Sequence, residues 1–246
     1  MVQLTKKDGI VVVAHRGASG YAPENTIASF DRAVSMGADM VELDVHPTRD
    51  DHLVVMHDET VDRTTGAHGR ISSMSLEEIR GLNAAAEFPG GLHERVPTLS
   101  EVLERYADRT TLTIEVKHGS SVYPGVEHNV IEELKAHDAI DKVELISFDF
   151  DCLKNIRRES PHIKTGFIFV GNMASSADLV GGSVDALHGR WDFATASQVG
   201  HARALGYPCY LWTVNTEDEI RRAVGLAPDG IVSNFPDRAI EAVRRA

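Results

Sequence analysis

The sequence has few cysteines, no long hydrophobic run and no cluster of basic residues. Its two cysteines, Cys152 and Cys209, suit a reducing compartment better than a disulfide framework. No apolar stretch is long enough to cross a membrane, and the first residues lack the apolar core of a signal peptide. The net charge is -12, whereas nucleic-acid binding needs clustered Lys and Arg. We therefore expect a cytoplasmic protein without integral membrane association and without a nucleic-acid partner.

Motifs for nucleotide binding are also missing. There is no Gly-x-Gly-x-x-Gly between a strand and a helix, no P-loop and no low-complexity linker. The 246 residues, of which 42% are hydrophobic, fit one large soluble domain of the size of an α/β barrel. We predict a single domain over residues 1–246. Because the net charge repels anions, an anionic substrate would need a metal ion or a few well-placed cations.

Short apolar runs alternate with amphipathic segments along most of the chain. Strands are expected at residues 10–14, 40–45, 111–116, 143–147, 164–170, 184–188, 209–214 and 230–233. Helices are expected at residues 26–36, 97–106, 126–136, 149–158, 194–205, 216–224 and 236–244, and a loop after 164–170. Eight strands with intervening helices predict an α/β fold, a closed TIM (β/α)8 barrel. A doubly wound open sheet is the alternative.

The alternation is interrupted after the second strand. Only residues 46–52 separate Val45 from Leu53, whereas a parallel crossover needs about a dozen residues. The segment 53–56 is therefore predicted to return antiparallel, within a small insertion that covers residues 46 to about 96. Residues 62–66 are typical of a turn, and residues 75–82 predict a short helix with a capping box.

Glu42 and Asp44 lie two residues apart in the strand predicted at 40–45 and so share one face. Two neighbouring carboxylates repel each other, and sheltering them from water makes their charges costly. A hard divalent cation such as Mg²⁺ or Ca²⁺ removes this conflict because it binds carboxylate oxygens. The alternative is a solvated acidic face with a surface histidine, His57, nearby.

Further polar groups follow the carboxyl ends of the predicted strands, where barrel enzymes carry their active sites. Glu115 with the acidic pair makes three carboxylates on two strands, which resemble a hard-cation site with open positions. His15 and His57 flank this site, and Arg16 and Lys117 would supply positive charge for a phosphate. Taken singly, Glu115 and Lys117 also fit an ion pair, and Trp212 fits the core. Their joint occurrence at one end of the fold favours a functional site.

Eight short motifs carry a resemblance that runs along nearly the whole chain. They are His15-Arg16-Gly17, Pro23-Glu24-Asn25-Thr26, Glu42-Leu43-Asp44-Val45, His57-Asp58, Asp62-Arg63-Thr64-Thr65-Gly66, Glu115-Val116-Lys117, Ser147-Phe148 and Trp212-Thr213-Val214-Asn215. In this order they resemble the glycerophosphodiester phosphodiesterase family.

The resemblance implies a TIM barrel with a small insertion after the second strand. It implies one divalent metal ion, Mg²⁺ or Ca²⁺, on Glu42, Asp44 and Glu115, and catalytic histidines at His15 and His57. Substrate contacts are expected from Arg16, Lys117, Phe148 and Trp212. The substrate would be a small glycerophosphodiester, cleaved to glycerol 3-phosphate and an alcohol, either through a cyclic phosphate or by direct attack of water.

Two positions depart from the family pattern and bear on substrate preference. Asn234 stands where the family usually has Asp, and His188-Gly189 stands where a Pro-containing turn is more common. A lipid phosphodiesterase of the lysophospholipase D or phospholipase C type is an alternative function. It would need an apolar membrane-facing patch, and the insertion around Phe88 and Leu92 is not strongly apolar. A catalytically silent barrel used as a binding protein is the other alternative.

Overall fold

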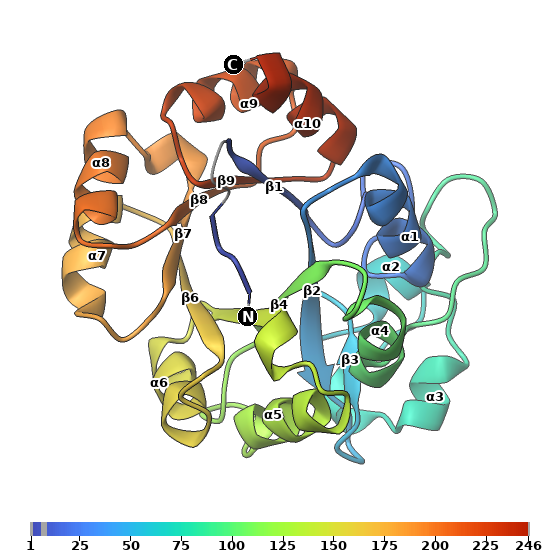
Figure 1. Ribbon diagram of the computed structural model, residues 1–246. Helices are drawn as coiled ribbons and strands as arrows, with labels where there is room; N and C mark the ends of the chain where they lie inside the picture. The colour runs from blue at the N-terminus through green and yellow to red at the C-terminus, as the bar shows by residue number, and fades with distance from the viewer. Residues whose placement is uncertain (1, 6–8, 246) are drawn as a thin grey trace.

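The computed structural model describes residues 2–5 and 9–245. Its parallel strands close into a ring, seen end-on in Figure 1, with the order β1-β9-β8-β7-β6-β5-β4-β2 and a final pairing of β2 with β1. The strands are β1 (Val11–Ala14), β2 (Met40–Pro47), β4 (Thr111–Val116), β5 (Val143–Ser147), β6 (Lys164–Phe169), β7 (Ala186–Arg190), β8 (Cys209–Trp212) and β9 (Gly230–Ser233). The predicted TIM (β/α)8 barrel is confirmed, and the open doubly wound sheet is wrong.

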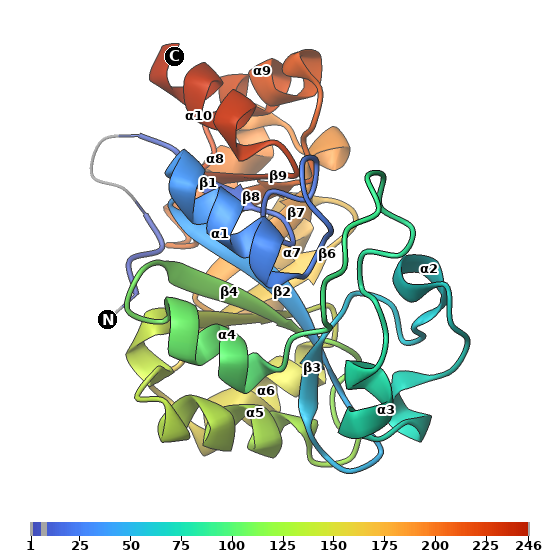
Figure 2. The same cartoon turned by 90° about the vertical axis from the view of Figure 1, so that its right-hand side faces the viewer.

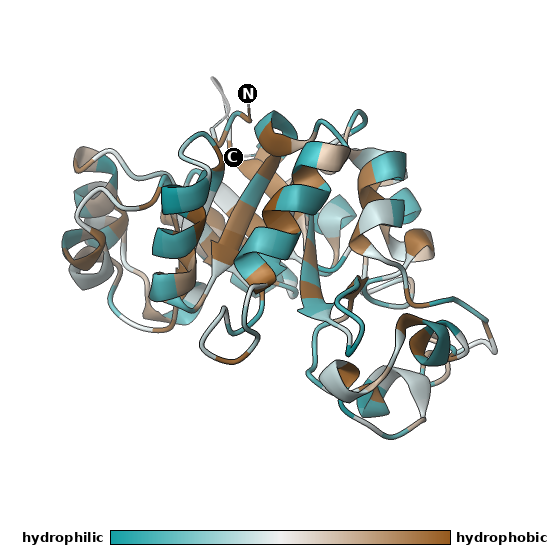
Figure 3. Ribbon diagram, turned by 90° about the horizontal axis from the view of Figure 1, so that it is seen from below, coloured by the Kyte–Doolittle hydropathy of each residue, from teal (hydrophilic) through white to brown (hydrophobic). Residues whose placement is uncertain are grey.

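Helices alternate with these strands, and most of them surround the ring and cover its outer face (Figure 1). They are α1 (Ile27–Met36), α2 (Asp62–Thr65), α3 (Leu76–Arg80), α4 (Leu99–Tyr106), α5 (Val126–Ala136), α6 (Phe150–Glu159), α7 (Met173–Val180), α8 (Ala196–Ala204), α9 (Glu217–Gly225) and α10 (Pro236–Arg245), with 3-10 turns η1 (Ile71–Ser73), η2 (Ile140–Lys142) and η3 (Trp191–Phe193). The strands are enclosed between the helices and the barrel interior, which explains why β1 is buried along its whole length. Figure 3 shows this separation, with apolar colour on the central strands and polar colour on the outward helix surfaces.

Several predicted boundaries are wrong for identifiable reasons. The loop expected after the strand at 164–170 contains α7, which buries Met173, Ala177 and Val180 at helical spacing. The small residues between them give this helix a weak sequence pattern. Helix α4 begins at Leu99 rather than at Pro97, because the Thr98 side chain accepts a hydrogen bond from the Glu101 backbone and so fixes the helix start.

Smaller differences occur elsewhere. The turn expected at 62–66 is one helical turn, α2, closed by Gly66. The last three barrel strands keep their order, but β7 begins at Ala186 and ends at Arg190, and β8 ends at Trp212. The capping box predicted for α3 is confirmed, with Ser75 and Glu78 bonded to each other's backbone N–H groups.

The segment between β2 and β4 leaves the ring, as Figure 2 shows for α2 and α3. Strand β3 (Leu53–Val55) pairs antiparallel with β2, with Val55 opposite Val45. This segment has an apolar cluster of its own, which includes Val54, Ile71 and Ile79. It returns the chain to the barrel mouth at His57. No helix in residues 2–5 and 9–245 is both long enough and apolar enough to cross a membrane.

Candidate active site

Three buried carboxylates lie at the carboxyl ends of neighbouring strands. Asp44 on β2 is in register with Glu115 on β4, and Glu42 lies two residues before Asp44 on the same face. Each offers an oxygen atom within 4.8 Å of the others. Only 4% of Glu42, 1% of Asp44 and 8% of Glu115 is exposed. Such a dense buried acidic group requires positive charge nearby.

Lys117 and Arg16 supply part of that positive charge. The Lys117 ammonium lies 2.8 Å from Asp44 and 2.7 Å from Glu115, so the ion pair considered from the sequence is present and is shared with Asp44. The Arg16 guanidinium approaches Asp44 at 3.5 Å, and the Asn25 amide donates to the same carboxylate at 2.8 Å. Two cations therefore face three carboxylates.

Burial and the nearby charges shift the pKa values of the three carboxylates in different directions. Burial alone would raise the pKa of Asp44, but Lys117 and Arg16 outweigh burial and hold this pKa well below its usual range. Burial and the adjacent Asp44 raise the pKa of Glu42 well above its usual range, despite the opposing charge of Arg16. Burial raises the pKa of Glu115 to about 7, with Lys117 acting in the opposite direction. Without a cation, Glu42 and Glu115 therefore resist ionisation.

The turn after β1 places Arg16 against the acidic group. Arg16 and Gly17 both adopt positive φ angles, 55° and 79°, and the Arg16 backbone N–H donates to Glu42 at 2.8 Å. A Cβ on Gly17 would lie 2.6 Å from the Ser29 backbone of α1, so only glycine fits this turn. The His15-Arg16-Gly17 motif is thus explained by its backbone geometry.

Two histidines face the same pocket with their orientation fixed through Nδ1. His15 Nδ1 lies 2.6 Å from the Asn234 amide oxygen, and His57 Nδ1 lies 2.7 Å from the Asp58 carboxylate. No described residue forms a hydrogen bond with Nε2 of either ring. Burial, with a smaller contribution from Arg16, lowers the pKa of His15 to about 4, and burial also lowers the pKa of His57. Both rings are therefore neutral near pH 7.

A further ion-pair network, which sequence reasoning missed, supports this arrangement. Arg63 of α2 donates to Asp58 at 2.7 Å and to Glu24 at 2.7 Å, and Glu24 also pairs with Arg16 at 3.0 Å. The network links the histidine carried by the insertion to the turn after β1. The motifs at 23–26 and 62–66 were visible in the sequence, but only the folded chain brings them together.

The pocket between these groups has a volume of about 150 Å³. It is lined by His15, Arg16, Glu42, His57, Glu115, Phe148 and Trp212, together with Val13, Thr113, Ile146, Ile168, His188, Thr213 and Val232. The Phe148 and Trp212 rings meet edge-on at 5.7 Å, and the Trp212 indole donates to the His188 carbonyl at 2.8 Å. Of the predicted residues, Asp44 does not line this pocket and contacts Arg16 and Lys117, whereas Lys117 lines an adjoining cleft that shares His57, Glu115 and Phe148 with it.

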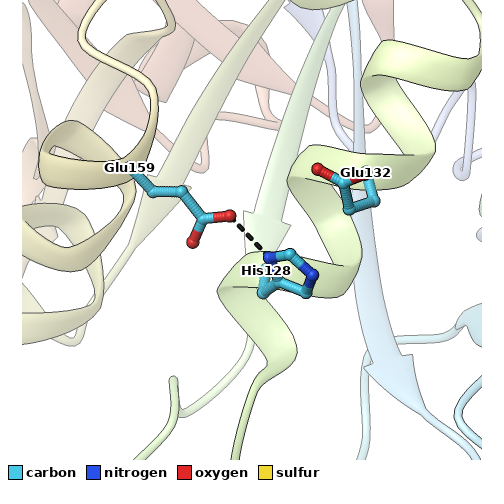
Figure 4. A group of neighbouring side chains, drawn as sticks. All are labelled: His128, Glu132 and Glu159. Atoms are coloured by element: carbon cyan, nitrogen blue, oxygen red, sulfur yellow. Dashed lines mark hydrogen bonds and ion pairs between the residues drawn. The ribbon is translucent and has the colours of Figure 1, made fainter.

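A second group of potential ligands lies on the outer surface. Figure 4 shows His128 and Glu132 on α5 beside Glu159 at the end of α6. All three are exposed, His128 already contacts Glu159 at 2.6 Å, and Glu132 pairs with Lys135 at 2.7 Å. Because water already solvates these charges, they do not require a cation as the buried carboxylates do.

The raised pKa of Glu42 leads to a prediction about the cation-free protein. Folding keeps the Glu42 carboxyl protonated, whereas the unfolded chain ionises it above its usual pKa of 4.5, so the stability contributed by the protonated form falls as pH rises. Glu42→Gln has no such titration. We expect the variant to melt at a higher temperature than wild type above pH 5. The difference should grow by roughly 2–4 °C per pH unit for as long as the Glu42 carboxyl of the folded protein stays protonated.

Thermal unfolding at pH 5, 6, 7 and 8 with chelator tests this expectation. The histidine contributions are common to both proteins and cancel in the difference. Saturating Mg²⁺ or Ca²⁺ should reverse the order, because wild type gains binding energy. A difference that does not change with pH would contradict the burial argument for Glu42.

A closed (β/α)8 barrel with buried carboxylates and two histidines in one pocket at the carboxyl ends of its strands has the form of a barrel enzyme. Residues 15–238 match the Glycerophosphoryl diester phosphodiesterase family. The chain belongs to this family.

Individual relatives match this chain over nearly its whole length. The chain is 37% identical to a glycerophosphodiester phosphodiesterase of Caldanaerobacter subterraneus subsp. tengcongensis, over 96% of this chain and 98% of that protein. A crystal structure of a glycerophosphodiester phosphodiesterase from Agrobacterium tumefaciens superimposes with a TM-score of 0.80, at 26% identity over 94% of this chain and 99% of that one. A phosphodiesterase of Oleispira antarctica, in complex with the product sn-glycerol-3-phosphate, gives a TM-score of 0.87 at 29% identity over 95% and 96%.

Proposed function

We propose that this protein hydrolyses glycerophosphodiesters to sn-glycerol 3-phosphate and an alcohol, with a divalent cation and two histidines. The observation that carries the proposal is one pocket that joins His15, His57, Glu42 and Glu115. The product complex of the Oleispira antarctica phosphodiesterase, at 29% identity, supports the choice of substrate class. Two curated relatives, 37% and 34% identical to this chain over the aligned residues, are both named glycerophosphodiester phosphodiesterase.

The donor set fits one hard divalent cation, Mg²⁺ or Ca²⁺, held by Glu42, Asp44 and Glu115. All the ligand atoms are carboxylate oxygens, which these ions prefer. Asp44 Oδ1 is buried and contacts the Lys117 ammonium at 2.8 Å, but Lys117 is shared with Glu115, and the raised pKa values of Glu42 and Glu115 indicate too little positive charge. When bound, the cation would offset the phosphodiester charge and polarise its oxygens.

Arg16 and Lys117 are assigned to the phosphate. Both hold their charge, since the neighbouring carboxylates outweigh burial and raise the pKa of each group. A phosphodiester anion that enters the pocket meets the Arg16 side chain on the wall, and Lys117 lines the adjoining cleft beside Glu115. Phe148 and Trp212 form an apolar wall that packs against the carbon atoms of the substrate. This arrangement binds and orients the diester.

The two histidines move protons. Asn234 accepts from His15 Nδ1–H without adding charge, which leaves Nε2 unprotonated and ready to take a proton from the nucleophile. The Asp58 carboxylate on His57 Nδ1 would stabilise this ring once it is protonated, and because the free ring is neutral near pH 7, His57 takes up a proton before it gives one to the leaving alcohol. The nucleophile is either the glycerol 2-hydroxyl, which gives a cyclic phosphate that water then opens, or water itself.

The proposal is tested with purified protein, glycerophosphocholine and glycerophosphoethanolamine. We expect release of sn-glycerol 3-phosphate in the presence of Mg²⁺ or Ca²⁺ and none with excess chelator. The cyclic route predicts that isotope-labelled cyclic glycerophosphate is also hydrolysed. Absence of release from folded protein with either metal would overturn the substrate class.

A lipid phosphodiesterase is the second candidate function. Large apolar side chains are about half exposed on the loops after four consecutive barrel strands, namely Val122, Phe148, Val170 and Phe193. Such a rim could contact the acyl chain of a lysophospholipid, which the insertion could not. A higher kcat/KM for lysophosphatidylcholine than for glycerophosphocholine would favour this candidate. The cytoplasmic location and the single domain over residues 1–246 stay predictions from the sequence. A catalytically silent barrel used as a binding protein stays the alternative if no diester is cleaved.

A further inference from the structure

A buried polar pair lies inside the barrel at the floor of the pocket. Glu144 on β5 and His188 on β7 are 0% and 2% exposed, and His188 Nε2 lies 3.1 Å from a Glu144 oxygen. Barrel interiors are usually filled by branched apolar side chains. The proton transfers and phosphate contacts proposed above use neither residue.

The strand between them leaves room for this contact. Strand β6 separates β5 from β7 in the ring (Figure 1), and it carries Gly166 at this level. A Cβ on Gly166 would lie 2.7 Å from both the Glu144 carboxylate and His188 Nε2. Only a glycine at this position lets the two side chains meet across the strand.

The His188 ring is held flat above an aromatic neighbour. Tyr210 stacks on it with a centroid distance of 4.6 Å and an interplanar angle of 5°. Tyr210 belongs to an apolar cluster with Leu4 and Met40 and does not line the pocket. His188 does line it, so one face of the imidazole is covered by Tyr210 while the ring still reaches the pocket.

Stability does not explain this pair. The second Glu144 oxygen, Oε2, is buried and has no hydrogen-bond partner among the described residues. An unpaired buried acceptor is destabilising, and a buried ion pair is often no more stable than apolar residues of the same volume. The cost suggests a role toward a ligand.

We propose that His188 is a specificity-determining residue that forms a hydrogen bond with a hydroxyl of the glycerol moiety. This inference rests on the proposed function. Glu144 engages Nε2, which leaves Nδ1 without a hydrogen bond in the described ranges. A hydroxyl both donates and accepts, so it pairs with Nδ1 in either protonation state.

The surroundings favour a polyol over a simple alkyl group at this point. The pocket that His188 lines is also lined by Val13, Ile146, Ile168 and Val232, which contact carbon atoms but cannot pair with a hydroxyl. Thr113 and Thr213 line it as well. A glycerol chain would place its carbons on the apolar wall and a hydroxyl on His188.

The test compares sn-glycerol 3-phosphate with n-propyl phosphate, which has the same carbon chain without hydroxyls. Isothermal titration calorimetry in saturating Mg²⁺ gives both Kd values. We expect wild type to prefer sn-glycerol 3-phosphate by about tenfold or more, the effect of one good hydrogen bond. In the double variant Glu144→Leu/His188→Phe, which keeps the stacked ring and leaves no buried charge, the preference should fall to about twofold or less.

Two further variants keep the outcome decisive. Glu144→Gln/His188→Asn retains a polar pair too short to reach the ligand, and it replaces the first double variant if that protein does not fold. Tyr210→Phe removes the hydroxyl bond to the Leu4 carbonyl but keeps the stack, so it should lower the melting temperature and leave the preference unchanged. Persistence of the tenfold preference in folded double variants would overturn the inference.

The outcomes separate this inference from the proposed function. If wild type binds both ligands equally and still releases sn-glycerol 3-phosphate from diesters, His188 has no such role and the proposed function stands. If wild type binds neither ligand and cleaves no glycerophosphodiester, both proposals fail.

Discussion

Replacement of His57 or His15 with alanine is expected to lower kcat/KM for glycerophosphocholine by about 10²–10⁴-fold, the usual contribution of a general acid or base. His57 sits half-buried at the pocket and is oriented by Asp58, and His15 is oriented by Asn234 from the opposite side. Removal of either ring leaves one proton transfer to water. Steady-state kinetics on purified variants with unchanged circular dichroism would measure the loss.

A matched control separates catalysis from a general effect of the substitution. His68 lies in the same insertion with 87% of its side chain exposed, so His68→Ala should keep wild-type kcat/KM. Wild-type turnover in either His57→Ala or His15→Ala would remove that histidine from the mechanism.

The unlike partners of the two histidines allow a sharper test of their roles. Asn234→Asp would place a carboxylate on His15 Nδ1, and a neighbouring carboxylate raises the pKa of a histidine. If His15 must be unprotonated to act, the acidic limb of the kcat/KM profile should move to higher pH by about one unit or more. An unmoved acidic limb would exclude His15 as the base.

Removal of divalent cations is expected to lower turnover by about 10³-fold or more, because a metal can supply several kcal/mol of transition-state stabilisation. The three buried carboxylates lie within 4.8 Å of one another, and among residues 2–5 and 9–245 two basic side chains, Arg16 and Lys117, pair with them. Chelator titration followed by addition of Mg²⁺ or Ca²⁺ measures the loss and its recovery.

Glu42→Gln should raise the cation concentration needed for half-maximal activity by at least about tenfold, because even outer-shell substitutions cost 10–100-fold in metal affinity. The neutral amide keeps the shape of the side chain but removes its charge. Glu132→Gln in the exposed group of Figure 4 is the matched control and should leave the titration unchanged. A wild-type titration curve for Glu42→Gln would exclude Glu42 as a ligand.

Local patterns were sufficient to predict most of the fold. The apolar run at 10–14, the acidic alternation at 40–45 and the short connection at 46–52 predicted a barrel with an antiparallel excursion after its second strand. Helix α7 was missed because the segment 173–180 is short, rich in Ala and Ser, and carries an exposed Leu179, so its buried positions show little periodicity. Weak local patterns of this kind acquire their meaning from packing against neighbouring helices.

The site was predicted by residue type but not in its connections. Alternation along a strand places Glu42 and Asp44 on one face, and the sequence predicted Glu115 beside them, but only the structure gives the register that sets Asp44 opposite Glu115. The Arg63 bridge between Asp58 and Glu24 joins residues up to 39 positions apart, and no periodic pattern relates them. The exchange of Asp for Asn at 234 was visible, but its contact with His15 was not.

The sequence by itself determined the family motifs, the order of strands and helices, and the residue types that can bind a cation and move protons. Those features depend on short-range periodicity and on side-chain chemistry, which a linear chain displays. Only the tertiary structure decided the uneven charge balance of the three carboxylates, the different partners of His15 and His57, and the Glu144–His188 contact across Gly166. Burial and long-range proximity cause all three, and both arise only when the barrel closes.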